Sequence, residues 1–226
     1  YKGIYLLEGL FRRDGSSKFS KENRWANFYG LSAGIRFSEF DFVKNWNLFD
    51  NLKLRASYGE TGSQGGIGNY DYYSVISLGN TVFGYDGTKV NTSWIGAMTS
   101  SKRTWEHVAT TNMAVDFAVL NNRLSGTFEY YIRKNNDMLI NLTYPATLGA
   151  DAPKSNSGGY RANGWELTLN WNDRIGDDFS YNVGFSLSDS RTEVTDYKGA
   201  VAISWGKNKI VEGRPINSIY VFKTNG

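Results

Sequence analysis

The sequence predicts an all-β protein whose strands follow one another as an antiparallel up-and-down meander. In seven segments, apolar and polar residues alternate with a period of two, as they do in a strand with one dry face and one wet face. The 226 residues include 25 glycines and only 3 prolines, and 15% of them are aromatic. This composition favours strands joined by turns over helices.

The first three strands are expected near residues 4–12, 28–38 and 51–59. In the first, Leu10 interrupts an otherwise regular alternation. In the second and third, every second side chain is apolar, and Gly, Ser, Lys or Arg lie between them. The apolar sets are Tyr5, Leu7, Gly9 and Phe11 in the first strand, Tyr29, Leu31, Ala33, Ile35 and Phe37 in the second, and Leu52, Leu54, Ala56 and Tyr58 in the third.

The fourth and fifth strands are expected to form a hairpin over residues 115–134. Asn121 and Asn122 separate two alternating runs, and asparagine tolerates the positive φ of a two-residue hairpin turn. One face of the hairpin would carry Val115, Phe117, Val119, Phe128 and Tyr130, and the other Asp116, Glu129 and Arg133.

The last two strands are expected near residues 164–173 and 179–188, with a tight turn at 176–178 between them. Their apolar faces again contain no charged residue and are rich in aromatic rings. These rings are Trp165, Trp171, Phe179, Tyr181 and Phe185. We find no convincing helix anywhere in the sequence.

The connections between the strands alternate in length. Long polar connections at 13–27, 60–103 and 134–163 alternate with shorter ones at 39–50, 121–122 and 176–178. In a meander, alternate connections emerge at the same end, so the long loops would gather at one end of the sheet. Transmembrane β-barrels have this asymmetry, and an aromatic-rich apolar face would suit lipid. A soluble β-sandwich with the same faces turned inward remains an alternative on these observations.

The chemistry of the chain argues against several functions. There is no cysteine, His107 is the one histidine, and the net charge is +3. We therefore expect no disulfide scaffold, no metal site, no cofactor, no nucleic-acid partner and no enzymatic activity. No apolar run approaches the length of about 18 residues that a transmembrane helix needs.

One loop carries candidate binding residues. The connection 60–103 sets aromatic rings among Gly, Asn and Ser, a combination suited to stacking on sugars or gripping peptides. It is equally open that the rings fold the loop back on itself. The candidate substrate-binding residues are Tyr70, Tyr72, Tyr73, Tyr85 and Trp94.

Several stretches, in order along the chain, carry a family resemblance. They are residues 5–19 (YLLEGLFRRDGSSKF), 23–25 (NRW), 31–37 (LSAGIRF), 52–62 (LKLRASYGETG), 105–106 (WE), 121–126 (NNRLSG), 163–166 (NGWE), 179–181 (FSY) and 212–215 (EGRP). Together they resemble the SusC/RagA-like TonB-dependent outer-membrane transporters of Bacteroidetes. Ile35 stands where that family is expected to have an aromatic residue.

The resemblance implies a partial transmembrane β-barrel, about seven to eight strands of a larger barrel, since such transporters have about 22 strands. Residues 1–226 would be part of one barrel domain, with the plug, the TonB box and the final strands absent from this chain. The implied activity is TonB-dependent import of oligosaccharides or peptides across the outer membrane of a Gram-negative cell. The side chains expected to face the lumen are Lys53, Arg55, Glu129, Arg133 and Glu166.

The resemblance also implies partners. These are a SusD-like surface lipoprotein, TonB acting through the missing N-terminal part, an oligosaccharide or peptide substrate, and outer-membrane lipid. The turn at Asn121 and Asn122 would be periplasmic. The competing hypothesis is a soluble extracellular β-sandwich module that binds glycans.

Overall fold

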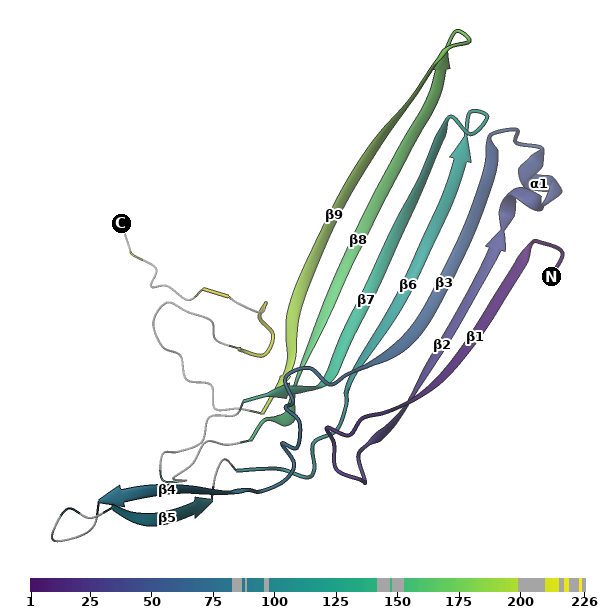
Figure 1. Cartoon of the computed structure of the whole chain (residues 1–226). Helices are drawn as coiled ribbons and strands as arrows, with labels where there is room; N and C mark the ends of the chain where they lie inside the picture. Colours follow the sequence, from purple (N-terminus) through teal and green to yellow (C-terminus); the bar gives the residue numbers. More distant parts are fainter. Residues whose placement is uncertain are drawn as a thin grey trace.

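The computed structural model describes residues 1–82, 87, 89–95, 98–141, 147, 153–198, 210–215, 218–219 and 224. Seven strands form one antiparallel sheet in which each strand pairs with its neighbours along the meander (Figure 1). They are β1 (Tyr5–Gly15), β2 (Trp25–Arg36), β3 (Phe49–Ser63), β6 (Glu106–Val119), β7 (Leu124–Ile140), β8 (Ser155–Ile175) and β9 (Phe179–Tyr197). All seven predicted strands are therefore confirmed, in the predicted topology.

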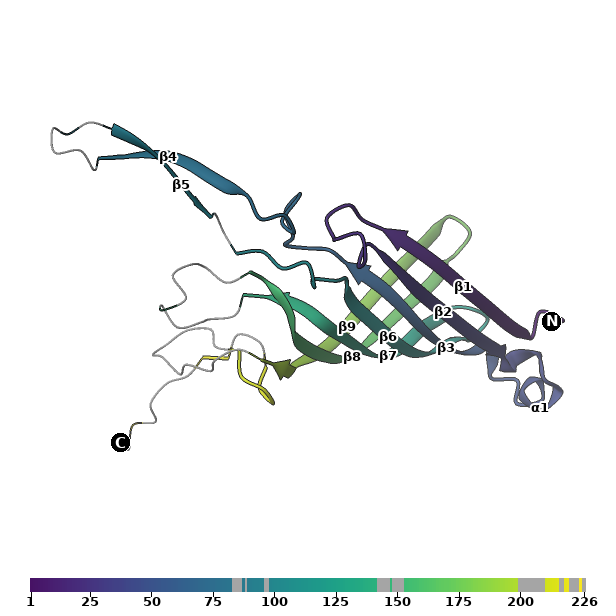
Figure 2. The ribbon, with the colours of Figure 1, turned by 90° about the horizontal axis from the view of Figure 1, so that it is seen from below.

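The sheet is curved and open, with β1 and β9 at its edges (Figure 2). Its apolar face has no covering layer among the described residues, and large side chains on it stay exposed, such as Leu7 at 80% and Leu31 at 58%. Along β3, Leu54 and Tyr58 are exposed, whereas Lys53 and Arg55 on the other face are less exposed. Because side chains crowd on the concave side of a curved sheet, we assign the polar side chains to that side and the apolar ones to the convex side.

This burial pattern argues against the β-sandwich alternative. A sandwich buries the apolar face of each sheet against the other sheet. Among the described residues, the apolar side chains of neighbouring strands pack sideways against one another, as where the ring of Phe128 stacks on that of Trp165 at 6.3 Å between centroids. The described sheet is thus a single layer with a barrel-like distribution of residues.

The strands are longer than predicted at the long-loop end. β7 continues to Ile140 and β8 starts at Ser155, so much of the connection predicted at 134–163 is strand. The pairing of β7 with β8 shifts register around Met138. That irregularity breaks the period-two pattern, which is why the alternation did not reveal these strand ends.

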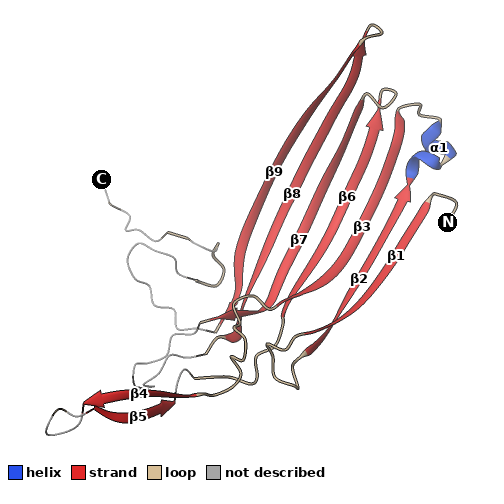
Figure 3. Cartoon of the chain, in the orientation of Figure 1, coloured by secondary structure: helices blue, strands red, loops and turns tan. Residues whose placement is uncertain are grey.

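The longest predicted loop contains a hairpin that the sequence did not indicate. Strands β4 (Ile76–Val82) and β5 (Lys89–Ile95) pair as a separate two-stranded sheet that projects from the long-loop end (Figure 3). Ser, Gly and Asn interrupt its alternation, so its composition resembles that of a loop. The expectation of no helix was also wrong, because a 3₁₀ turn, η1 (Phe37–Glu39), and one helical turn, α1 (Asp41–Lys44), lie between β2 and β3.

Both described hairpin turns contain left-handed residues, and the positive φ predicted for Asn121 and Asn122 is confirmed. Asn121 and Asn122 have φ of 56° and 62°, and Gly176 has φ of 64°. The hairpin turn is longer than the predicted two residues, since Val119 pairs with Leu124 and Leu120 also has a positive φ. The backbone N–H of Asn122 donates to Asp50 Oδ2 at 2.8 Å, which ties this turn to the start of β3.

The buried core lies at the long-loop end of the sheet rather than under its middle. The loop between β1 and β2 folds back on the ends of β2, β3, β6 and β7. The hydrophobic core cluster at this end of the sheet consists of Phe19, Phe28, Ile67, Trp105 and Leu139. Among the described residues, no helix is both long enough and apolar enough to cross a membrane.

Candidate functional site

A polar network on the concave face is the first part of the candidate site. Lys53 and Arg55 lie on β3, Asp116 on β6 and Glu129 on β7. The antiparallel register sets Lys53 opposite Asp116. Facing residues of paired strands project from the same side of a sheet, so the alternation within each strand brings the four charged groups together.

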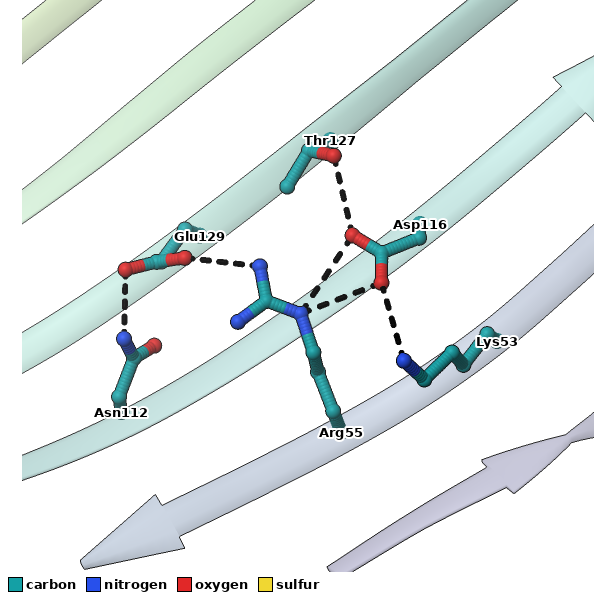
Figure 4. A network of polar contacts seen from close by, with 6 residues as sticks. All are labelled: Lys53, Arg55, Asn112, Asp116, Thr127 and Glu129. Atoms are coloured by element: carbon teal, nitrogen blue, oxygen red, sulfur yellow. Dashed lines mark hydrogen bonds and ion pairs between the residues drawn. The ribbon is translucent and has the colours of Figure 1, made fainter. Parts of the chain in front are cut away.

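The guanidinium of Arg55 is the centre of this network (Figure 4). Its Nε lies 3.1 Å from Asp116 Oδ2, and its NH2 lies 2.9 Å from Glu129 Oε2. Lys53 Nζ lies 4.0 Å from Asp116 Oδ2. Two cations thus balance two carboxylates on the wall of the concave face.

Two neutral side chains complete the hydrogen bonding of the carboxylates. Asn112 Nδ2 donates to Glu129 Oε1 at 2.5 Å, and Thr127 Oγ1 donates to Asp116 Oδ1 at 3.0 Å. The charged groups of Asp116 and Glu129 keep 24% of their side-chain area exposed. Such a network is ordered by its own bonds yet remains wet, so it can contact a polar ligand or a polar protein segment.

A hollow of about 560 Å³ lies next to this network. Its lining includes Glu8, Ser32 and Gly34 from β1 and β2, together with Lys53 and Arg55. Ser32 Oγ donates to Glu8 Oε2 at 3.4 Å. Ser32 has a small side chain and Gly34 has none, so both leave space beside charged groups, as a polar channel wall requires.

The structure groups only some of the predicted lumen residues. Lys53, Arg55 and Glu129 meet in the network, whereas Arg133 and Glu166 lie on the same face outside it. Glu166 is exposed and faces Glu129 in the register of β7 and β8. Asn112 was missed, although extending the alternation from Asp116 by steps of two would have reached it.

The tyrosines of the loop after β3 form the second part of the candidate site. The rings of Tyr72 and Tyr73 lie 4.3 Å apart, and those of Tyr70 and Tyr73 lie 6.4 Å apart. A hydrogen bond with the Tyr73 side chain raises the pKa of Tyr72 above its usual value. The three rings therefore lie close together within the loop, with Tyr73 next to both of the others.

Of the other two candidate aromatic residues, Trp94 and Tyr85, the structure describes only Trp94. Trp94 lies on β5, where its ring packs over Gly79 of β4 and remains 53% exposed. Tyr85 lies outside the described residues.

A second hollow, of about 380 Å³, opens beside Tyr70 and Tyr73 and is also lined by Arg103 and Lys154. Arg103 is held in place by donating from Nε to Ser100 O at 3.2 Å and from NH2 to Asp71 O. Lys154 Nζ donates to Gly66 O at 2.8 Å. The side chain of Arg103 is 8% exposed and its NH1 lies 3.7 Å from Asp71 Oδ2, so Lys154 is the more accessible cation beside the aromatic rings of this hollow.

Comparisons with known proteins place this geometry in context. No protein-family model matches the chain. It is 28% identical to TonB-dependent receptor P39 of Formosa agariphila over 229 residues, which are 100% of this chain and 21% of the relative. It is 32% identical to TonB-dependent receptor P26 of the same organism over 199 residues, which are 88% of this chain and 20% of the relative.

A third relative is TonB-dependent receptor SusC of Bacteroides thetaiotaomicron, 30% identical over 236 residues, which are 97% of this chain and 23% of the relative. Among solved structures, the RagAB peptide importer in the 'closed-closed' state superimposes with a TM-score of 0.82 and 26% identity, covering 96% of this chain and 23% of that one. The chain thus spans about a fifth of the length of the curated relatives it matches. In sequence and in fold, it belongs to the SusC/RagA-like family of TonB-dependent receptors, of which it is a β-barrel segment.

Proposed function

We propose that the chain is part of the barrel of an outer-membrane receptor that imports a nutrient with energy passed through TonB. Residues 1–226 would form one part of a single barrel domain. The observation that carries this proposal is the arrangement of the sheet, with exposed apolar side chains on its convex face and charged, hydrogen-bonded side chains on its concave face. A barrel wall between lipid and a wet lumen requires this arrangement.

The substrate we propose is an oligosaccharide or a peptide. The similarity to structures described as a peptide importer supports the peptide, and the family resemblance allows either. Lys53, Arg55, Glu129, Arg133 and Glu166 would line the lumen. Tyr70, Tyr72, Tyr73, Tyr85 and Trp94 would lie in outward-facing segments, near a SusD-like surface lipoprotein. The hollow beside Tyr70 and Tyr73 supports this placement.

Charge placed on each face tests the membrane assignment. In the full-length receptor, we expect Leu169→Arg to lower the free energy of unfolding by about 2–4 kcal/mol in phospholipid vesicles, because the charge would face the bilayer. Thr168→Arg is the matched control, since its side chain lies on the opposite face of the same strand. The measurement is urea unfolding of reconstituted receptor. A loss for Leu169→Arg that is the same in detergent and in phospholipid vesicles, or recovery of the wild type in the soluble fraction, would instead favour the β-sandwich glycan-binding module.

Removing loop tyrosines tests the binding assignment. We expect Tyr70→Ala and Tyr73→Ala each to weaken substrate affinity about fivefold, because an aromatic contact contributes about 1 kcal/mol. Binding of labelled peptide and oligosaccharide libraries to whole cells measures this effect. Tyr181→Ala, at the opposite end of the sheet, is the control. If both loop variants bind every ligand as the wild type does, these tyrosines do not contact substrate.

A further inference from the structure

The connection between β2 and β3 is the longest at the short-turn end of the sheet. It runs over residues 37–48 and includes η1 and α1, whereas the other two described turns at this end cover residues 120–123 and 176–178. It is also unusually apolar. Its large apolar side chains are Phe37, Phe40, Phe42, Val43, Trp46 and Leu48.

The aromatic rings of this connection form a continuous series. Successive ring centroids lie 6.2 Å apart from Tyr5 to Phe40, 5.7 Å from Phe40 to Phe42, 6.1 Å from Phe42 to Trp46 and 6.5 Å from Trp46 to Phe49. The series therefore begins on β1, crosses the connection and ends on β3.

Both ends of the series lie on the convex apolar face. Tyr5 faces Ile35 of β2, and both belong to the apolar sets of their strands. Phe49 faces Val119 of the apolar set of β6, because a register shift between Phe49 and Asn51 brings it to that face. The rings of the connection thus extend the apolar face past the ends of the strands. This makes the connection continuous with the surface that the barrel fold turns towards lipid.

The outer side chains of the connection are exposed although its backbone is ordered. Trp46 is 60% exposed and Phe42 is 55% exposed, whereas Val43 between them is 2% exposed. The backbone N–H groups of Val43 and Lys44 both donate to Phe40 O at 3.0 Å. Lys44 Nζ lies 3.6 Å from Glu39 Oε2, so part of the charge here is paired within the connection.

We propose that residues 37–49 form an interfacial anchor, in which Phe42, Trp46 and Leu48 insert into the boundary between headgroups and acyl chains of the adjoining phospholipid leaflet. Trp prefers this boundary because its ring is apolar and its N–H remains hydrogen-bonded. Backbone hydrogen bonds within residues 40–47, such as Trp46 N–H to Val43 O at 3.0 Å, fix the segment that presents these rings. The inference rests on the proposed function only in requiring that the barrel lies in a membrane.

Fluorescence quenching in the reconstituted full-length receptor tests the anchor. This chain contains no cysteine, so a bimane label can be placed at Trp46→Cys or Phe42→Cys, with any cysteine elsewhere in the receptor replaced by serine. Trp94→Cys is the matched control, because Trp94 is 53% exposed but lies on the projecting hairpin. Phe128→Cys reports on the convex face itself. The quenchers are brominated phosphatidylcholine in the bilayer and iodide in the buffer.

We expect brominated lipid to quench the labels at residues 42 and 46 as strongly as the label at residue 128, with little effect of iodide. We expect iodide to quench the label at residue 94 strongly and brominated lipid to have little effect on it. The anchor is refuted if brominated lipid quenches the label at residue 128 but iodide quenches the labels at residues 42 and 46. It is also refuted if neither quencher affects the labels at 42 and 46, because a protein partner would then cover them. If residue 128 is also not quenched by lipid, the proposed membrane location itself fails.

Discussion

The two ends of the sheet are both rich in aromatic residues, but large rings are buried at one end and exposed at the other. At the long-loop end, Trp105 is 5% exposed and packs on Phe19 and Phe28, with ring centroids at 5.2 Å and 6.0 Å. At the short-turn end, Trp46 is 60% exposed. At the long-loop end, segments from several connections fold back over these rings and cover them. At the short-turn end, no described segment covers Trp46, so its ring depends on what surrounds the protein.

The long-loop core is also joined by specific hydrogen bonds between distant segments. Trp105 Nε1 donates to Arg24 O at 3.1 Å, and the backbone N–H of Leu139 donates to the buried Glu106 Oε1 at 2.8 Å. Asn156 Nδ2 donates to Thr104 O at 3.0 Å. Bonds from Arg103 NH2 to Asp71 O and from Lys154 Nζ to Gly66 O tie the loop that carries the tyrosines to these segments. The outward end is therefore organised by the protein itself.

The largest effect should come from Trp105. We expect Trp105→Ala to lower the free energy of opening of the long-loop end by about 3–5 kcal/mol, as removal of a large buried aromatic ring does. Hydrogen exchange at the amide of Leu139 in the full-length receptor measures this loss. Trp46→Ala is the comparison at the other end, and in detergent we expect it to change protection by less than about 0.5 kcal/mol. Equal effects of the two variants would show that the ends do not differ as described.

A smaller effect should follow from filling the space at Gly62. A Cβ there would lie 2.8 Å from Trp105 Cε3 and would also meet the ring of Phe28. We expect Gly62→Ala to cost about 1–3 kcal/mol through overpacking of the core. Gly59→Ala on the same strand is the control, because nothing lies within 4 Å of its Cβ position. Urea unfolding of the two variants should separate them, and identical midpoints would mean that the core at Gly62 can yield.

The smallest effect is expected at the exposed ion pair of the short-turn end. Arg123 pairs with Asp173 and stacks over the ring of Trp171 at 5.2 Å, but half of its side chain is exposed. We expect a coupling free energy between Arg123→Ala and Asp173→Asn of about 0.2–1 kcal/mol, decreasing with added salt. A double-mutant cycle measures it. A salt-independent coupling well above this range would mean that this end has an organised core of its own.

The sequence predicted local features better than those that depend on distant segments. The seven strands, their two faces, the left-handed Asn121 and Asn122 and the tight turn at 176–178 follow from residues close together in the chain. The β4–β5 hairpin was missed because its alternation is weak. The helical turn at Asp41–Lys44 was missed because one turn is too short to show a helical period.

In the candidate site, the sequence likewise predicted which residues share a face but not which of them contact one another. The alternation placed Lys53, Arg55 and Glu129 on one face, but only the register of β3, β6 and β7 decided that they share one network with Asp116. Arg133 and Glu166 have the same alternation and stay outside it. Which charges meet depends on pairing between strands, and that pairing is not encoded within any one of them.

The sequence by itself thus determined that each strand has a dry face and a wet face, because side chains on an extended backbone alternate whatever surrounds them. Only the tertiary structure decided which face is exposed. The curvature of the sheet and the absence of a covering layer over its described apolar face arise from contacts among all seven strands. It also decided that Trp105 is buried and Trp46 is not, because burial depends on whether a distant segment folds back over the ring.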